Sequence, residues 1–133
     1  MKTLKLVLAA LAFLSLTACS TLSDQAKVGN IHKNYIGQHQ YVKDNTQYGV
    51  SEKWTPSLVG DCEDYALFIY KKAKKLGVST SVWIVRTETN EPHVVVVVGD
   101  KYVVDNRFNY VVAKADVQYK WIIAVPQATL EKY

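Results

Sequence analysis

The segment that decides the fold, residues 60–98, reads GDCEDYALFIYKKAKKLGVSTSVWIVRTETNEPHVVVVV. Its first part predicts a helix over residues 62–76, because Asp61 and Asp64 form a capping-box pattern and Gly77 supplies the C-terminal stop. The lysines of its last two turns complement the helix dipole. One apolar stripe recurs at helical spacing and predicts the buried face: Ala66, Ile69, Tyr70, Ala73 and Leu76.

The second part of the segment changes from helical to strand patterning. Residues 81–86 are β-branched and aromatic, residues 87–92 predict a loop, and His93 opens a run of five valines. Residues 101–105 and 119–125 predict two more strands, and the short connections indicate an antiparallel sheet. Because the valine run is apolar throughout, we expect it to be covered on both faces, on one by the helix. The predicted fold class is α+β.

Composition limits the class of protein. With 133 residues the chain has the length of about one domain. Hydrophobic residues make up 49% and charged ones 21%, with 3 Pro and 6 Gly, which excludes wholesale disorder, collagen-like repeats and a disulfide scaffold. The formal net charge of +4 falls when Lys2 and Lys5 are removed with a leader, so composition does not favour nucleic-acid binding.

The N-terminus predicts a leader and an anchor. Residues 1–18 combine a basic start with an apolar run too short to span a bilayer, as in a secretory signal peptide. The sequence LTAC ending at Cys19 resembles the bacterial lipobox, which implies lipidation of Cys19 and a membrane anchor. Ser20 after the cysteine favours, by the same resemblance, the periplasmic face of an outer membrane. We therefore expect a lipidated polar tether over residues 19–34, which includes His32, and a catalytic domain over residues 35–133.

Cys62 is the one cysteine left once Cys19 is lipidated. A lone thiol in an oxidising compartment is unusual, so Cys62 is either an inert packing residue or a nucleophile. Its place in the first turn of a helix favours a thiolate, and His93 at the start of the valine strand is the predicted base. Both features predict a lowered pKa for the thiol. His39, outside this order of residues, is expected at the surface.

The third group should orient the imidazole, and both Asp105 and its neighbour Asn106 are placed to do so. The hairpin between the two strands decides between them. A strict two-residue turn would set His93 opposite Asn106, whereas a three-residue loop over residues 99–101 puts His93 and Asp105 on one face as diagonal neighbours. We predict the odd-length loop, or a bulge, and Asp105 as the orienting group.

These residues carry a family resemblance. The motif GDCEDYA at residues 60–66 resembles the nucleophile motif of the bacterial transglutaminase-like cysteine proteinases. The segments HVVV at residues 93–96 and VVDN at residues 103–106 resemble that family's His and Asp strands. The resemblance covers about residues 35–125. It implies a papain-like or transglutaminase-like core, a Cys62–His93–Asp105 triad and a protein substrate in the envelope. The short chain and the lipobox depart from the characterised relatives, which cleave large surface adhesins.

Acidic residues crowd the predicted nucleophile. Asp61, Glu63 and Asp64 should raise the pKa of the thiol unless they face away, pair with a cation or bind Ca²⁺. Calcium is also what the resemblance implies, because some relatives bind it through acidic residues beside the nucleophile. Capping of the helix by the two aspartates, with Glu63 in solvent, is the structural alternative. The reaction itself requires no cofactor, and no second Cys or close His pair supports zinc.

An acyl-transfer reaction also needs hydrogen-bond donors for the oxyanion. The backbone N–H of Cys62 is one, and Trp54, Gln40 and Tyr41 are candidates for the other. Three functions follow from the same residues. The first is a cysteine peptidase acting on an envelope protein, and the second is amidase or transglutaminase chemistry through the same thioester. The third is a lipid-anchored binding or exclusion factor that keeps the fold without catalysis.

Overall fold

The computed structural model describes residues 22–43 and 53–133. The predicted signal peptide and the predicted lipidation site at Cys19 lie outside these residues. No helix in the described part of the chain combines the length and apolar character needed to cross a membrane.

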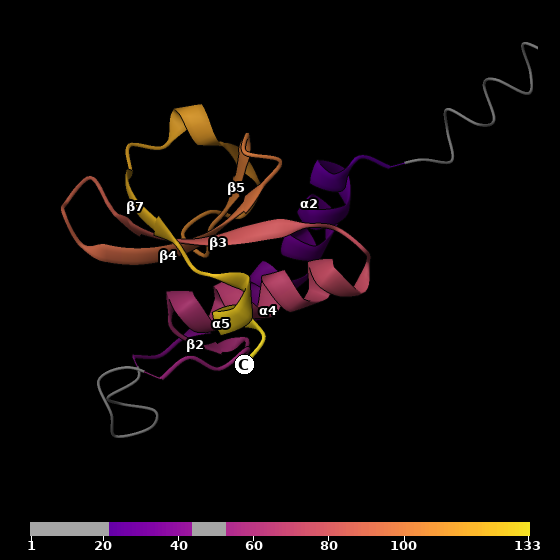
Figure 1. The fold of residues 1–133 in the computed structure, drawn as a ribbon, viewed down its shortest axis with the longest axis horizontal. Helices are drawn as coiled ribbons and strands as arrows, with labels where there is room; N and C mark the ends of the chain where they lie inside the picture. Colours follow the sequence, from indigo (N-terminus) through magenta and orange to yellow (C-terminus); the bar gives the residue numbers. More distant parts are fainter. Residues whose placement is uncertain (1–21, 44–52) are drawn as a thin grey trace, which may run out of the picture.

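The structure is an α+β fold with two sheets (Figure 1). A five-stranded antiparallel sheet has the order β6-β5-β4-β3-β7, and β1 and β2 form a short parallel pair. Helices α2 and α4 pack together on one face of the larger sheet. The elements are α2 (Asp24–Tyr35), the 3-10 helix η1 (Ile36–Gln38), β1 (Gln40–Tyr41), β2 (Val59–Gly60), α4 (Cys62–Lys75), β3 (Thr80–Arg86), β4 (Pro92–Val98), β5 (Tyr102–Val104), β6 (Val112–Ala113), the 3-10 helix η2 (Lys114–Asp116), β7 (Lys120–Ala124) and α5 (Gln127–Leu130).

Helix α4 begins at Cys62, as the capping pattern predicted. The side chain of Asp61 accepts from the backbone of Asp64, whose own side chain accepts from the backbone N–H of Asp61. Gly77 follows the helix in the left-handed region, at φ 74°. The predicted apolar stripe is buried apart from Leu76, which is 54% exposed, so that part of the prediction is wrong. The helix ends before Leu76, and this side chain faces a surface groove instead of the core.

The close packing at the start of α4 restricts residue 60 to glycine. A Cβ atom at Gly60 would overlap the side chain of Asp64, including its Oδ2 atom. The β2 strand therefore runs directly against the capping carboxylate, and the backbone N–H of Thr55 donates to the Oδ1 atom of Asp64 at 2.8 Å. The segment before the helix and the first helical turn form one packed unit that sets the position of Cys62.

The valine strand β4 is covered on both faces, as predicted. Val94, Val96 and Val98 belong to the core beneath α4 and α2. Val95 and Val97 belong to a second cluster on the opposite face of the sheet. This second cluster also contains Val85, Val103 and Tyr119, with Trp83 and Trp121 packed against it. The sheet is therefore the middle layer of the domain, and its β4 strand is the most completely buried one.

The hairpin between β4 and β5 has the predicted three-residue loop. Val98 pairs with Tyr102 and Val96 with Val104, so residues 99–101 form the connection. Gly99 and Asp100 both have positive φ values, 59° and 57°. Positive φ is costly for most residues, but glycine and aspartate tolerate it in turns. This register puts the side chains of residues 93 and 105 on the same face.

The expectation that residues 19–34 form a polar tether is wrong for residues 24–34. They form helix α2, which packs against α4 and completes the main core. Val28 and His32 are fully buried, and Ile31 is 8% exposed. The folded domain therefore begins before residue 35. The helix escapes prediction because few of its side chains are apolar and one of its buried residues is a histidine.

Candidate active site

Cys62 lies at the start of α4 and lines a hollow of about 290 Å³. His93, at the start of β4, lines the same hollow, together with Tyr41 from β1. The remaining lining residues come from the β3–β4 loop, the first position of β4 and the segment after β5: Thr87, Thr89, Glu91, Pro92, Asn106 and Arg107. The fold thus brings the predicted nucleophile and the predicted base, which are far apart in the sequence, to one solvent-facing site.

The surroundings of Cys62 favour the neutral thiol over the thiolate. Its Sγ atom donates to the Oε2 atom of Glu63 at 3.2 Å. Burial raises the pKa of this thiol, the negative charge and hydrogen bond of Glu63 raise it further, and Asp61 adds to the effect. The backbone of Val94, the residue after His93, acts in the opposite direction. The expected lowering of the thiol pKa is therefore wrong, because burial and a facing carboxylate outweigh the helix dipole.

His93 and Asp105 form a buried hydrogen-bonded pair. The Nε2 atom of His93 lies 2.8 Å from the Oδ1 atom of Asp105, and the two residues are 7% and 1% exposed. Burial works against ionisation of Asp105, but the contacts with His93, Tyr119 and the backbone of Arg107 outweigh it and lower the pKa of the carboxyl. An ionised carboxylate only accepts, so Nε2 carries the proton. In neutral His93 the Nδ1 atom is therefore the basic one.

Two residues that hold Asp105 escaped prediction. The hydroxyl of Tyr119 donates to the Oδ2 atom of Asp105, and the backbone N–H of Arg107 donates to Oδ1 at 2.9 Å. The guanidinium of Arg107 in turn donates to the Tyr119 hydroxyl at 3.2 Å and pairs with Glu88. The sequence signal at Tyr119 was only a strand start. No periodicity reveals that this tyrosine reaches a carboxylate 14 residues away in the sequence.

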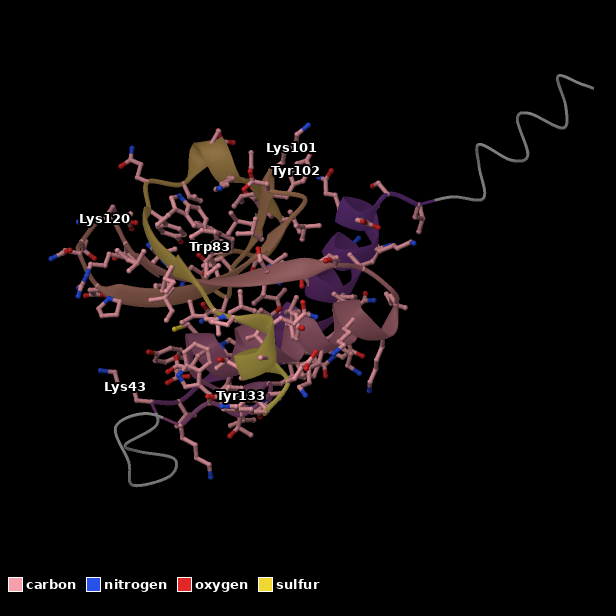
Figure 2. The ribbon with its side chains drawn as sticks, viewed as in Figure 1. Lys43, Trp83, Lys101, Tyr102, Lys120 and Tyr133 are labelled. Carbon is pink, nitrogen blue, oxygen red and sulfur yellow. The ribbon has the colours of Figure 1, made fainter. Side chains whose placement is uncertain are left out.

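The three oxyanion candidates lie in different places. Tyr41 lines the hollow with Cys62. Gln40 pairs with Val59 in the parallel β1–β2 ladder and is not among the residues of the hollow. Trp54 stacks on Tyr133 at a centroid distance of 6.0 Å and lines a separate apolar hollow near the C-terminus, where Figure 2 labels Tyr133. Gln40 and Trp54 are therefore not brought to the active-site hollow, since strand pairing and C-terminal packing use them elsewhere.

The acidic residues beside Cys62 are used within the protein. Asp61 and Asp64 form the capping box, and Asp64 also accepts from Thr55. Glu63 is only 5% exposed and faces the thiol, so the expectation that it would be solvated is wrong. Within residues 22–43 and 53–133, no group of three or more His, Cys, Asp or Glu side chains is placed to hold a metal ion. The two aspartates thus cap the helix, as the structural alternative predicted.

A second polar network lies behind the site. The His32 Nε2 atom donates to the carbonyl of Phe108 and its Nδ1 atom accepts from the Tyr65 hydroxyl, each at 2.7 Å. The ring of His39 contacts Tyr65 and lies 3.4 Å from the amide nitrogen of Asn106. Burial lowers the pKa of both histidines. His32 is therefore a fully buried neutral residue, not a residue of a tether or surface.

The fold resembles that of solved structures. LapG of Legionella pneumophila matches with a TM-score of 0.66 at 16% identity, covering 84% of this chain and 70% of that chain. The calcium-bound form of the same protein matches with the same values. At this identity the likeness concerns the fold. No match was found among curated proteins.

The sequence gives the assignment at the level of the family. A family profile described as bacterial transglutaminase-like cysteine proteinase, BTLCP, matches residues 15–132. This range includes α2 and α4, the five-stranded sheet and the hollow at Cys62. The chain belongs to the family of bacterial transglutaminase-like cysteine proteinases and is a cysteine peptidase of that type.

Proposed function

We propose that the protein is a lipid-anchored cysteine peptidase of the cell envelope in which Cys62 is the nucleophile, His93 the general base and Asp105 the orienting group. The observation that carries the proposal is the shared hollow of Cys62 and His93, combined with the 2.8 Å contact that fixes His93 to Asp105. That contact leaves the Nδ1 atom of His93 to accept a proton.

The reaction begins from the neutral thiol. The S–H proton leaves its contact with Glu63 and passes to the Nδ1 atom of His93, and Sγ attacks the carbonyl carbon of the substrate. The imidazolium is stabilised by the Asp105 carboxylate, which remains ionised because Tyr119 and the Arg107 backbone also donate to it. The backbone N–H of Cys62 is the proposed first donor to the oxyanion, with Tyr41 as the second.

The tetrahedral intermediate then collapses to a thioester. The carbon–nitrogen bond breaks, and the leaving amine takes the proton held on Nδ1 of His93. A water molecule, deprotonated by the same nitrogen, attacks the thioester and releases a carboxylic acid, and the proton returns to sulfur. The Nδ1 atom of His93 thus carries every proton transfer in these steps, and the backbone contributes only a hydrogen bond to the oxyanion.

The place of action follows from the N-terminal pattern. The lipobox cysteine, Cys19, supports an anchor at a membrane facing the periplasm, with the outer membrane favoured by Ser20. An envelope or surface protein is the proposed substrate because the family consists of proteinases. Calcium at the acidic residues beside Cys62 stays a prediction: the calcium-bound form of LapG, a protein of similar fold, supports it, and the capping contacts of Asp61 and Asp64 do not exclude it.

The decisive experiment compares envelope protein termini in cells that carry the wild-type protein with those in cells that carry Cys62→Ala. We expect new N-termini only with the wild type. In purified protein, a thiol probe should label Cys62 faster in the wild type than in His93→Ala, with Lys120→Ala as a surface control. Crosslinked amides in place of free carboxylates would indicate transamidation. Full function in a Cys62→Ser strain would contradict the catalytic proposal and favour a binding role.

A further inference from the structure

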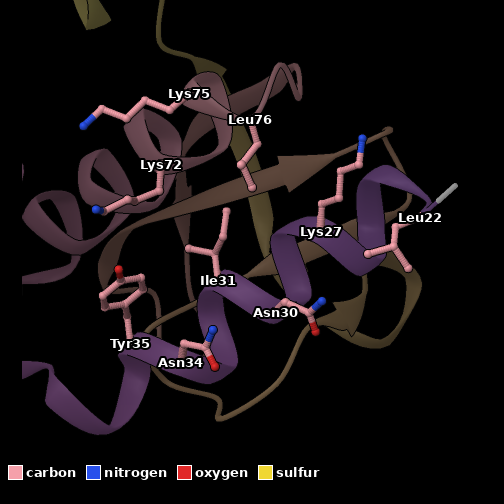
Figure 3. A pocket seen from close by; sticks show the side chains of 9 residues that line it. All are labelled: Leu22, Lys27, Asn30, Ile31, Asn34, Tyr35, Lys72, Lys75 and Leu76. Carbon is pink, nitrogen blue, oxygen red and sulfur yellow. The ribbon is translucent and has the colours of Figure 1, made fainter. Parts of the chain in front are cut away.

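A second and larger hollow lies between α2 and the C-terminal half of α4. Its volume is about 560 Å³, compared with about 290 Å³ for the hollow at Cys62. Its apolar lining residues come from both helices and from the chain just before α2: Leu22, Ile31, Tyr35 and Leu76. Figure 3 shows Ile31 and Leu76 pointing toward one another across this α2–α4 groove. The peptidase mechanism uses none of these residues.

The charged residues of the α2–α4 groove all carry the same sign. Lys27, Lys72 and Lys75 line it, and no aspartate or glutamate does. None of the three forms an ion pair with the described residues, whereas the neighbouring Lys74 pairs with Glu131 at 3.7 Å. The groove therefore presents a local concentration of positive charge that the described part of the chain does not neutralise.

The helix dipole accounts for only part of this charge. Lys72 and Lys75 lie in the last turns of α4, where a cation is favourable. Lys27 lies near the N-terminal end of α2, where the dipole disfavours a cation. The groove thus collects lysines both from a helix end that favours a cation and from a helix end that disfavours one. An anion outside the chain would stabilise all three positions.

The apolar component of the groove is exposed as well. Leu22 and Leu76 are each 54% exposed, and Leu76 continues the apolar stripe of α4 beyond the part that the core covers. The ammonium group of Lys72 lies over the rings of Tyr35 and Phe68, at 5.3 and 5.5 Å from their centroids, which leaves its charge without a counter-ion in the described part of the chain. Exposed aliphatic groups beside ammonium groups without an ion pair are the pattern of a surface that binds an anionic amphiphile. A small inorganic anion would use the lysines and leave these two leucines in water.

We propose that the α2–α4 groove docks on an anionic phospholipid surface, with the lysines at the headgroups and the leucines at the level of the acyl chains. The inference rests on the proposed anchor for one point only, the nearness of the membrane: Leu22 follows closely after Cys19 in the sequence. The charge and shape of the groove do not depend on the anchor.

Docking in this way orients the active site. Cys62 begins α4 and Lys75 ends it, and a helix of 14 residues is about 20 Å long. The hollow at Cys62 thus lies at the opposite end of α4 from Lys75 and shares no lining residue with the α2–α4 groove. Each lysine near an anionic surface should strengthen docking about fivefold.

The test uses the full lipidated chain reconstituted in vesicles of phosphatidylcholine, with or without phosphatidylglycerol. The acyl chains of the anchor insert into both kinds of vesicle, so a difference in lysine modification between the two vesicles reflects contact of the groove with the anionic lipid. The measurement is the rate at which an amine-reactive reagent modifies each lysine. We expect about fivefold slower modification of Lys27, Lys72 and Lys75 with phosphatidylglycerol present. Lys101 and Lys120, exposed around the sheet in Figure 2, should not change.

Matched variants complete the test. Lys27→Glu with Lys75→Glu should abolish the protection of Lys72, whereas Lys101→Glu with Lys120→Glu, an equal change in net charge, should retain it. Equal modification rates in the two kinds of vesicle would overturn the proposal. So would equal protection by inorganic phosphate, which would indicate a small-anion site. Flotation of the chain with phosphatidylglycerol vesicles but not with phosphatidylcholine vesicles would contradict the lipid anchor and leave the groove proposal standing. The labelling of Cys62 by a thiol probe tests the peptidase proposal and depends on neither the anchor nor the groove.

Discussion

At the scale of single residues, the carboxylate of Glu63 adds to burial in favouring the neutral thiol of the nucleophile. It accepts the thiol proton of Cys62 and contributes to the raised pKa of that thiol. Glu63→Gln removes the charge at constant shape, so the pKa of Cys62 should fall and the thiolate fraction at neutral pH should rise. A fall of one unit would speed alkylation about tenfold.

The rate of Cys62 alkylation by a small thiol reagent, followed by mass spectrometry, checks this expectation. Glu131→Gln is the matched control, because Glu131 is an exposed carboxylate that pairs only with Lys74 in the described chain. An alkylation rate that is the same in Glu63→Gln and wild type would contradict the role assigned to Glu63.

Tyr119 and Asp105 give a second prediction at this scale. Asp105→Asn replaces an obligate acceptor by a group that can donate to Nε2, so the proton of His93 moves to Nδ1 and the base is lost. Peptidase activity should fall by about 10²–10⁴-fold. Tyr119→Phe removes one hydrogen-bond donor from Asp105 and should lower peptidase activity less than Asp105→Asn does. It should also move the acid limb of the activity–pH profile to higher pH, because Tyr119 helps lower the pKa of Asp105.

Measuring activity against pH for both variants separates orientation from folding. A merely structural role for Tyr119 would lower activity equally at every pH. Tyr102→Phe, a change at a half-buried tyrosine of the neighbouring strand β5, is the control and should leave the profile unchanged.

At the scale of elements, Gly60 tests the unit formed by β2 and the first turn of α4. Gly60→Ala places a Cβ atom against the capping carboxylate of Asp64, so we expect a loss of about 1–3 kcal/mol in the free energy of unfolding. Gly37→Ala is the matched control, since no atom lies within 4 Å of a Cβ at that position. Urea denaturation measures both, and equal stabilities would show that Asp64 moves aside without cost.

The elements also show what the sequence can and cannot reveal. Helix α4 follows from local rules, a capping box and a left-handed stop at Gly77. The register of the β4–β5 hairpin follows from the requirement that His93 and Asp105 share one face of the sheet. Helix α2 could not be found in this way. Its burial rests on Val28, Ile31 and the histidine His32, which contacts partners far away in the chain.

In the candidate site, too, some features follow from the sequence and others depend on tertiary contacts. The residue types and their order along the chain are enough to point to Cys62, His93 and Asp105. The state of the thiol does not follow from them, because it depends on which way the Glu63 side chain turns. Nor does the contact of Tyr119 with Asp105, since it joins residues that tertiary folding alone brings together.

At the scale of the whole molecule, α2 makes the N-terminal segment part of the folded unit. Deleting residues 1–35 removes Val28, Ile31 and His32 from the core. Burial of an aliphatic side chain contributes about 1.5–3 kcal/mol, so the loss is comparable with the whole stability of a small domain. We expect this truncated chain to lose cooperative thermal unfolding, whereas a chain that lacks only residues 1–21 should retain it. Cooperative unfolding of both would restore the view that the segment is a tether.

The stability of the whole molecule should also have a maximum near neutral pH, limited on each side by a different buried group. The pKa of His32 is lowered from 6.5 by burial, so below pH 6.5 the unfolded chain binds more protons and stability falls. His39 acts in the same direction. The pKa of Cys62 is raised from 9.0 by burial, so above pH 9 only the unfolded chain loses the thiol proton, and stability falls again.

Unfolding free energies from urea titrations at a series of pH values check both limits. His32→Asn should flatten the acid limb and leave the alkaline limb unchanged, whereas Cys62→Ser, which does not titrate, should flatten the onset of the alkaline limb only. Asp105 adds a separate loss below pH 3.8, because its carboxylate is stabilised in the folded state and its pKa is lowered. If His32→Asn lost stability with falling pH as steeply as the wild type, the acid limb would belong to other groups, and buried neutral His32 would not be its source.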